Sequence, residues 1–425
     1  MSPSTPLEGG RPAVDFLISL ERFGMKFGLA NIARLCEALG HPERSFTSLI
    51  VGGTNGKGSV TAMVDAALRA AGHRCARYTS PHLLRLEERF VIDGAEVAPA
   101  ALDAAAARVQ QAATALVASG ALESLPTFFE CTTAVAFELF RGADVEIAVL
   151  EVGLGGRLDA TNIVSPAAAA IVSIDIDHEA QLGDTIASIA AEKAGIVKPG
   201  IPVVCGPLPD EALRVISAIC VERGATLIRT DLDRSLAQRV AAMRLSLAGA
   251  HQRANAAVAV KLLETIDADA SRRIRVDSDA IREGLAGTVW PGRLETFDTK
   301  GCRVVLDAAH NPAGARALAS YLQGVAPEGV TLVFGAMKDK AVVDMLSALA
   351  PGVRRVFCTT APNPRAAPAT ELAAIAERIG MNAEAVEDPL AALDRACGLG
   401  AMVAVAGSIF LLGPVRERLA RDILR

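Results

Sequence analysis

A glycine-rich segment between an apolar run and a helical pattern constrains this chain more than any other feature. Leu49-Ile50-Val51 predicts a strand, residues 60–71 predict the following helix, and Gly52-Gly-Thr-Asn-Gly-Lys-Gly-Ser59 lies between them. Glycines let backbone N–H groups curl around phosphate oxygens, a lysine adds a cation, and a serine at a helix N-terminus offers Mg²⁺ a hydroxyl. We therefore predict a phosphate-binding loop. A glycine-rich turn that binds nothing is the alternative, but it explains neither Lys57 nor Ser59.

Composition excludes several function classes. Charged residues make up 21% of the 425 residues and the net charge is −5, so no global positive field attracts nucleic acid or a membrane surface. The first residues lack a basic segment followed by an apolar run, which favours a cytoplasmic protein. The apolar stretch 401–415 is broken by glycines and a proline and is shorter than the roughly 20 residues of a membrane helix.

The eight cysteines form no C-x-x-C pair, so the sequence suggests neither a zinc knuckle nor a redox motif. We expect most of them to be small buried hydrophobic residues in a reducing compartment.

Short apolar runs alternate with helical patterns along the whole chain, which predicts parallel strands covered by helices. In the first part, strands are expected at 47–52, 145–150, 168–174 and 202–205, and a helix at 99–118. A second series begins after Trp290-Pro-Gly-Arg293, with strands at 303–306, 330–334, 353–358, 383–386 and 401–406 and helices at 312–323, 340–349, 370–379, 389–396 and 409–421. The fold class is therefore α/β, with domains 1–290 and 291–425 and a boundary within 286–296.

Acidic residues follow two of the expected strands in the first domain. Glu151 ends one strand, and Asp175, Asp177 and His178 follow another. An acid at the carboxyl end of a strand beside a phosphate loop is a usual position for a Mg²⁺ ligand. The structural alternative for Glu151 is a helix cap or a salt bridge to Arg157.

The second domain repeats a strand that leads into a polar turn, with Asp307, His310 and Asn311. Asn311 could simply cap the helix that Pro312 begins, but that role leaves Asp307 and His310 unexplained. Arg293 lies at the domain junction, where it could reach a phosphate and stabilise transition-state charge. Ser80 is ambiguous from chemistry alone, since it is a metal ligand or a turn hydroxyl. For Lys193, chemistry alone favours an ordinary charge near the C-terminus of a helix.

Seven motifs occur in an order that resembles the folylpolyglutamate synthase and dihydrofolate synthase family, relatives of the Mur ligases. They are GTNGKGS at 53–59, YTSPHL at 78–83, EVGLGGRLDATN at 151–162, DHEAQLG at 177–183, EKAGI at 192–196, PGRLE at 291–295 and DAAHNP at 307–312. YTSPHL together with EVGLGGRLDATN is more specific than a phosphate loop and separates this family from the Mur enzymes.

The resemblance implies an ATP-dependent, amide-forming ligase built from a P-loop NTPase-like parallel-sheet domain and a smaller Rossmann-like α/β domain. In such an enzyme, ATP phosphorylates a carboxylate of dihydropteroate or a folate, and the amine of L-glutamate then attacks the acyl phosphate. The partners implied are these small molecules alone, with no nucleic acid or membrane, and the enzyme is expected to be a monomer.

The resemblance also assigns residues. The catalytic set is Lys57, Glu151, His178, Lys193, Arg293 and His310. ATP contacts are Gly53, Thr54, Asn55, Gly56, Lys57, Gly58, Ser59, Asn255, Arg293, Asp307 and His310. Two Mg²⁺ ions are expected on Ser59, Ser80, Glu151, His178 and Lys193, the lysine being carbamylated by CO₂. The acceptor substrate is expected at Ser80, Pro81, His82, Phe128, Phe129, Glu130 and Asp159, although two aromatics on a helix also suit a core.

Two positions depart from the family pattern, Ala308 where glycine is common and Ala341 where an acid is common. Neither removes a group assigned to the chemistry. The alternatives are a Mur-type ligase acting on a nucleotide-linked muramyl substrate, a small-molecule kinase or NTP hydrolase, and an inactive nucleotide-binding module. The sequence leaves open whether dihydropteroate, folate or both are acceptors.

Overall fold

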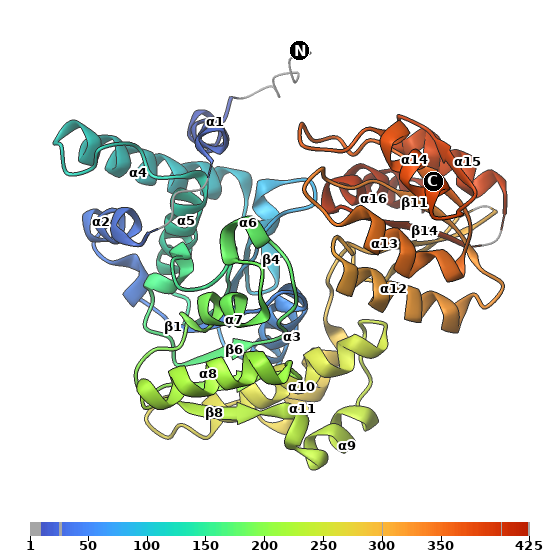
Figure 1. Ribbon diagram of the computed structural model, residues 1–425. Coiled ribbons are helices and arrows are strands. Elements are labelled where there is room, and N and C mark those ends of the chain that lie inside the picture. Colours follow the sequence, from blue (N-terminus) through green and yellow to red (C-terminus); the bar gives the residue numbers. More distant parts are fainter. Residues whose placement is uncertain (1–9, 25–27, 300, 401, 424–425) are drawn as a thin grey trace. The chain divides into compact units, whose positions relative to one another are not determined.

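The computed structural model describes residues 10–24, 28–299, 301–400 and 402–423, which form two compact units (Figure 1). The larger unit draws on Met1–His82, Leu86–Met243 and Ala256–Leu285, and the smaller on Leu83–Arg85, Arg244–Asn255 and Ala286–Arg425. Helix α10 (Ala250–Asp267) contributes its first turns to the smaller unit and the remainder to the larger.

The larger unit is built on an eight-stranded sheet of order β4-β3-β2-β5-β1-β6-β7-β8. Its strands are β1 (Thr47–Gly52), β2 (Cys75–Tyr78), β3 (Phe90–Ile92), β4 (Ala95–Glu96), β5 (Ile147–Glu151), β6 (Ala168–Ile171), β7 (Pro202–Cys205) and β8 (Thr226–Arg229). Strands β2, β5, β1, β6, β7 and β8 pair in parallel. The pairs β2–β3 and β3–β4 are antiparallel. Asp93 and Gly94 join β3 to β4 with φ of 50° and 81°, the left-handed pair that a tight hairpin turn requires.

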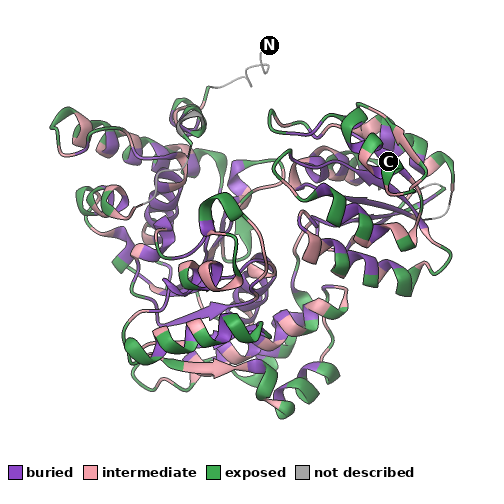
Figure 2. Cartoon of the chain, viewed as in Figure 1, coloured by how far each residue is buried: buried purple, intermediate pink, exposed green. Residues whose placement is uncertain are grey.

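Helices cover both faces of this sheet and bury its apolar strands (Figure 2). One apolar core joins part of one face of the sheet to α1, α2, α4 and α5, and another joins neighbouring strands on that same face to α7 and α8. The helices besides α10 are α1 (Pro12–Ser19), α2 (Ala30–Ala38), α3 (Lys57–Ala70), α4 (Pro99–Ala118), α5 (Phe128–Gly142), α6 (Glu179–Leu182), α7 (Ile186–Ala194), α8 (Asp210–Glu222), α9 (Arg234–Ala242) and α11 (Ser278–Gly287).

The smaller unit has a six-stranded sheet of order β13-β12-β11-β14-β10-β9, in which only β9 is antiparallel. Its strands are β9 (Glu295–Asp298), β10 (Arg303–Leu306), β11 (Val330–Phe334), β12 (Val353–Cys358), β13 (Ala383–Ala385) and β14 (Met402–Ala406). Its helices are α12 (Pro312–Val325), α13 (Val342–Leu349), α14 (Ala369–Arg378), α15 (Pro389–Gly398) and α16 (Ile409–Ile423). Apolar cores lie on both faces of the sheet.

The predicted α/β class is confirmed, and the differences from the expected boundaries that bear on the phosphate loop are the following two. The helix after the phosphate loop begins at Lys57 rather than Val60, because Gly56 adopts φ of 83° and ends the loop there. The strand expected at 168–174 ends at Ile171, because the following residues leave the sheet and bond to the phosphate loop. Among the described helices, none is both long and apolar enough to cross a membrane.

Six of the eight cysteines are buried thiols, as expected. The other two, Cys302 and Cys397, form a disulfide whose Cα atoms are 5.4 Å apart. They are 95 residues apart in sequence, and their spacing carries no signal of the pairing.

Candidate active site

The carboxyl ends of four adjacent parallel strands bring the candidate residues of the larger unit together. Strand register places Val51 beside Glu151, Gly52 beside Ile171, and Tyr78 beside Leu150. The segments that follow β1, β2, β5 and β6 therefore leave the sheet at one edge. In parallel sheets this edge is the usual position of a ligand site.

The chain after β6 holds the phosphate loop in place. The Thr54 amide donates to the Ser173 carbonyl at 2.8 Å, and the Asn55 amide donates to Ser173 Oγ at 2.9 Å. Thr54 Oγ1 donates to the Asp175 carbonyl at 3.2 Å. Gly53 has φ of 143°, and a Cβ there would lie 3.1 Å from the Ser173 amide nitrogen, so this position requires glycine.

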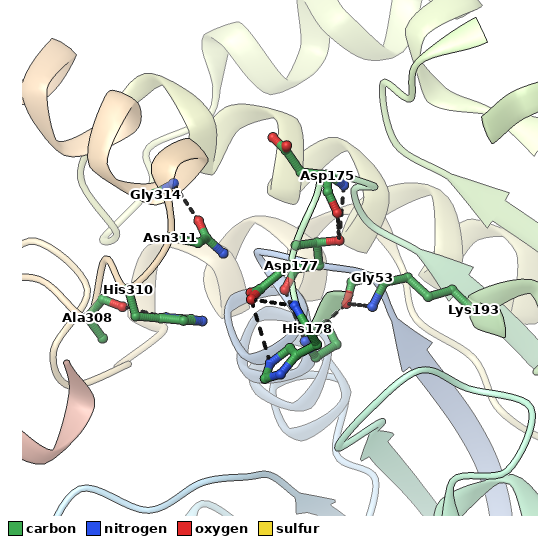
Figure 3. Close-up of polar contacts among 11 residues, drawn as sticks. Gly53, Asp175, Asp177, His178, Lys193, Ala308, His310, Asn311 and Gly314 are labelled. Carbon is green, nitrogen blue, oxygen red and sulfur yellow. Dashed lines mark hydrogen bonds and ion pairs between the residues drawn. The ribbon is translucent and has the colours of Figure 1, made fainter. Parts of the chain in front are cut away.

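Two lysines converge on the same loop carbonyl. Lys57 Nζ donates to Gly53 O at 3.0 Å and to Thr54 O at 3.1 Å, and Lys193 Nζ donates to Gly53 O at 2.9 Å (Figure 3). Lys193 is only 5% exposed. Burial, followed by the charge of Lys57, lowers the pKa of Lys193 to about 7. Lys193 is thus not a solvated charge at the end of α7.

The donors beside the loop suit Mg²⁺. Glu151 is buried and its Oε2 accepts a hydrogen bond from the Ser80 amide at 3.1 Å, while Ser59 lies buried in the first turn of α3. Mg²⁺ takes oxygen ligands and is commonly held by one or two carboxylates, with waters and substrate phosphates completing the octahedron. In the described ranges no three His, Cys, Asp or Glu side chains cluster as a metal cage. The Glu151 carboxylate and the Ser59 hydroxyl are oxygen donors of the kind that Mg²⁺ takes beside a bound phosphate.

His178 lies on the segment after β6, just before α6. Its backbone is left-handed with φ of 54°, its amide donates to Asp177 Oδ1 at 2.9 Å, and its side chain is exposed, with Nε2 3.9 Å from the same oxygen (Figure 3). The structure thus places His178 beside a carboxylate, on the segment that also supports the phosphate loop.

Close packing joins the glycine-rich loop after β5 to the end of α7. The Arg157 amide donates to the Glu192 carbonyl at 2.8 Å, and its guanidinium pairs with the Glu192 carboxylate at 2.8 Å. A Cβ on Gly156 would lie 2.7 Å from the Lys193 carbonyl, and one on Gly195 would lie 2.2 Å from Arg157 Cβ. Gly156 of the EVGLGGRLDATN motif and Gly195 of the EKAGI motif thus let this loop approach the helix that carries Lys193.

Replacing Gly195 by alanine is expected to destabilise the protein by on the order of 2 kcal/mol, because overpacking against a neighbouring backbone commonly costs 1–3 kcal/mol. Gly195 already has helical dihedrals, so only the clash with Arg157 opposes the new methyl group. Urea denaturation measures the effect. Gly142→Ala in α5 is the matched control, since a Cβ there meets nothing within 4 Å, and its midpoint should not fall. Equal midpoints for the two variants would contradict this packing.

Aromatic residues gather near the YTSPHL segment. Phe128 and Phe129 begin α5, and Phe129 lies 6.0 Å from the buried ring of Tyr78. Arg89, which the sequence did not single out, lies 5.1 Å from the centre of the Phe128 ring. Its Nε donates to His82 Nδ1 at 2.9 Å, and burial together with Arg89 lowers the pKa of His82 to about 4. His82 is thus a neutral acceptor. No sequence pattern distinguishes Arg89 from surface arginines.

Two acids expected at the acceptor site are hydrogen-bonded within the chain. Glu130 Oε2 accepts from the amide and the hydroxyl of Thr127 at 2.7 and 2.8 Å, forming a capping box at the start of α5. Asp159 accepts from the Thr161 amide at 3.0 Å and the Leu154 amide at 2.9 Å, and burial raises the pKa of its carboxyl. Both serve the local structure. Ser80 and Pro81, which are also expected at the acceptor site, are joined by a cis peptide bond.

The smaller unit holds a second group at the carboxyl end of β10. Asp307 accepts from the Leu294 amide at 3.0 Å and the Ala309 amide at 3.0 Å. His310 Nδ1 is 2.9 Å from the Ala308 carbonyl, and Asn311 accepts from the Gly314 amide at 2.9 Å as the N-cap of α12 (Figure 3). The capping role considered for Asn311 is therefore confirmed.

Asn255 lies in α10 within the same unit. It is buried, and its Nδ2 donates to Gln252 Oε1 at 2.9 Å. The structure thus places Asn255, Arg293, Asp307 and His310 in one unit, and the other candidate residues in the larger unit.

Comparison with known proteins gives consistent matches. Residues 292–409 match the model of the Mur ligase, glutamate ligase domain. The dihydrofolate synthase/folylpolyglutamate synthase of Bacillus subtilis is 33% identical over 94% of this chain and 96% of its own length. A probable bifunctional folylpolyglutamate synthase/dihydropteroate synthase of Haloferax volcanii is 37% identical over 97% of this chain, which spans about half (51%) of that relative.

Solved structures agree with these matches. A folylpolyglutamate synthase of Mycobacterium tuberculosis, complexed with ADP and AMPPCP, has a TM-score of 0.86 and 34% identity, covering 96% of this chain and 99% of that one. A bifunctional folylpolyglutamate synthase/dihydrofolate synthase with Mn, AMPPNP and L-glutamate bound has a TM-score of 0.82 and 31% identity, covering 98% of this chain and 100% of that one.

Proposed function

We propose that this chain, which belongs to the folylpolyglutamate synthase and dihydrofolate synthase family, is an ATP-dependent ligase that joins L-glutamate to a carboxylate of dihydropteroate or a folate. The observation that carries the proposal is the convergence of Lys57 and Lys193 on the phosphate loop, at the sheet edge where Glu151 ends β5. A simple kinase would need Lys57 to bind phosphate but would leave Lys193 without a role.

The proposed reaction has two steps. A carboxylate is a poor electrophile because its leaving group would be oxide, so its oxygen first attacks the γ-phosphorus of ATP and ADP leaves. The glutamate amine then attacks the acyl carbon, phosphate leaves with one former carboxylate oxygen, and the amine loses a proton to give the amide. Exclusion of water protects the acyl phosphate from hydrolysis.

Lys57 is proposed to neutralise charge on the transferring phosphoryl group, and the loop amides from Gly53 to Ser59 to bind the phosphates. Mg²⁺, when bound, offsets the charge of the phosphates and orients them. Ser59, Ser80, Glu151, His178 and a modified Lys193 are the residues that would hold the two ions. Asn255, Arg293, Asp307 and His310 are proposed nucleotide and phosphate contacts.

We propose that Lys193 is carbamylated. An ammonium repels Mg²⁺, whereas a carbamate supplies hard oxygen ligands. The EKAGI match and the burial of Lys193 beside Lys57 support the modification. Addition of CO₂ needs a neutral amine, and the lowering of the Lys193 pKa to about 7 makes the neutral form far more accessible at pH 7 than in an ordinary lysine. The neutral amine attacks the CO₂ carbon and loses one proton.

The acceptor is proposed to bind beside Phe128 and Phe129, whose flat rings suit a pterin, with Ser80, Pro81, His82, Glu130 and Asp159 around it. Aromatic packing between Tyr78 and Phe129 supports a preformed apolar wall. We further propose that the enzyme is monomeric and cytoplasmic. Light scattering of the purified chain tests whether it is a monomer.

Dual acceptor use is the expected result of a substrate assay. ADP release should depend on L-glutamate and on either dihydropteroate or a reduced folate, and mass spectrometry should show one added glutamyl residue on each acceptor. A product from one acceptor alone, at saturating concentrations of both, would show that the enzyme is monofunctional. ADP release that does not depend on glutamate would instead indicate a kinase or hydrolase.

A further inference from the structure

The disulfide between Cys302 and Cys397 has no part in the proposed ligase chemistry, and it lies in the smaller unit. Cys302 directly precedes β10, whereas Asp307 directly follows it, so roughly 15 Å of extended chain separates the two. Cys397 lies in the last turn of α15, which leads to β14, the parallel neighbour of β10. The disulfide therefore anchors the amino end of the strand whose carboxyl end carries Asp307.

Most of the smaller unit lies inside the covalent loop that this bond closes. The two cysteines are 95 positions apart, and the chain between them contains β10 to β13 and α12 to α14. A cross-link restricts the unfolded chain, and in the chain-entropy account a longer loop gives a larger stabilisation. The oxidised chain is therefore expected to be more stable than the reduced chain.

The two cysteines differ in their access to solvent. Cys302 is only 7% exposed, whereas Cys397 is partly exposed. The two residues that follow Cys397 are exposed, Leu399 by 55%, and a Cβ on Gly398 would meet nothing within 4 Å. The accessible side of the disulfide is thus that of Cys397.

The surroundings of Cys302 suit a leaving group and then a thiol. Thr299 Oγ1 lies 3.2 Å from Cys302 Sγ, a distance at which a hydroxyl donates to a thiolate. Both cysteines also border the apolar core on one face of the sheet, where a free thiol packs as a small hydrophobic residue. The six other cysteines of the chain are buried thiols of this kind. The folded unit can therefore accommodate both cysteines in the reduced form.

We infer that Cys302 and Cys397 are a reversible redox pair, which a dithiol reductant opens by attack at Cys397 Sγ. The thiolate of the dithiol bonds to Cys397 Sγ, the S–S bond breaks, and its electron pair leaves on Cys302 Sγ, which takes a proton. The second thiol of the dithiol then displaces Cys397 as a thiol and closes the dithiol's own disulfide. The protein gains two electrons and two protons, and the dithiol loses them.

Opening this pair lowers the stability of the smaller unit and leaves the groups proposed to contact ATP unaltered. Disulfides in cytosolic proteins are usually transient or redox-sensing, which fits the cytoplasmic location proposed above. The inference goes beyond the ligase function, because it concerns the stability of the unit rather than the ligand that the unit binds.

Differential scanning fluorimetry of the full chain, purified without reductant, tests the inference. Dithiothreitol is expected to lower the melting temperature of the smaller unit by about 5–10 °C, and oxidised glutathione should restore it. Iodoacetamide treatment of the folded chain, followed by mass spectrometry, should find Cys302 and Cys397 alkylated only after reduction. With glutathione as the reductant, the trapped intermediate should carry glutathione on Cys397 and the alkyl group on Cys302.

Two variants control the measurement. The double variant Cys302→Ala/Cys397→Ala should melt near the temperature of the reduced chain and should not respond to dithiothreitol. The matched control is Cys220→Ala, which removes a buried thiol of α8 in the larger unit and should keep the full dithiothreitol-dependent shift.

Equal melting temperatures in the two redox states, alkylation of the pair without reductant, or reduction that requires unfolding would overturn the inference. Glutathione found on Cys302 would overturn attack at Cys397. Glutamate-dependent ADP release at 25 °C should agree within about twofold between the two redox states, because the disulfide lies at the opposite strand end from Asp307. A larger difference would overturn the claim that opening the pair changes stability alone.

Discussion

Replacing Lys57 by alanine is expected to lower the turnover number at least about a hundredfold, because removing one preorganised charge contact to a developing anion commonly costs that much. The structure holds Lys57 Nζ against the Gly53 and Thr54 carbonyls of the phosphate loop, which limits the reorganisation needed when ATP binds. Glutamate-dependent ADP release at saturating substrates measures the effect.

Lys261→Ala is the matched control for Lys57→Ala. Lys261 lies on α10 and pairs with Asp233 and Glu264 in the larger unit. Its loss removes the same charge and the same side chain but should leave turnover within about twofold, since surface ion pairs contribute little to stability. Near-normal turnover of folded Lys57→Ala would remove Lys57 from the catalytic set.

Lys193→Ala should be nearly inactive, and short carboxylates such as acetate should restore part of the activity by supplying the oxygens that a carbamate would provide. The same acetate should not rescue Lys57→Ala, which lacks a cation rather than an oxygen ligand. Carbon-13 NMR with labelled bicarbonate should show a carbamate signal in the unaltered chain and no such signal in Lys193→Ala.

The pH dependence of the modification follows from the lowered pKa of Lys193. As pH falls below about 7, the amine is increasingly protonated and cannot attack CO₂, so activity should fall on the acidic side and added bicarbonate should oppose the loss. Full activity of a CO₂-depleted enzyme that lacks the carbamate signal would contradict the proposed modification.

The sequence predicted the strand ends better than the contacts between them. The glycines, lysine and serine of the phosphate loop and the acid that ends β5 were visible because they occur at the end of an apolar run. The order β2-β5-β1-β6 that brings Ser80 beside Glu151 was not visible, because adjacent strands such as β1 and β6 are up to about 120 residues apart in the chain. The Asp93-Gly94 hairpin turn was visible in principle, since that dipeptide favours such turns.

Side-chain environments were less predictable than positions. Lys193 looked like an ordinary helix-end charge, and only the folded structure shows it buried against Gly53 beside a second lysine. Glu130 matched a substrate segment, yet its carboxylate caps α5 through Thr127. Arg89 carried no pattern of its own, because a lone cation acquires its role from neighbours distant in sequence.

Transfer of oxygen from the acceptor to phosphate tests the central claim most directly. With dihydropteroate labelled by ¹⁸O in both carboxylate oxygens, unlabelled ATP and L-glutamate, mass spectrometry should find one ¹⁸O in the inorganic phosphate for each amide formed, and one retained in the amide. That result requires a bond between the carboxylate oxygen and the γ-phosphorus. Amide formation that yields unlabelled phosphate, or that releases AMP instead of ADP, would contradict activation through an acyl phosphate.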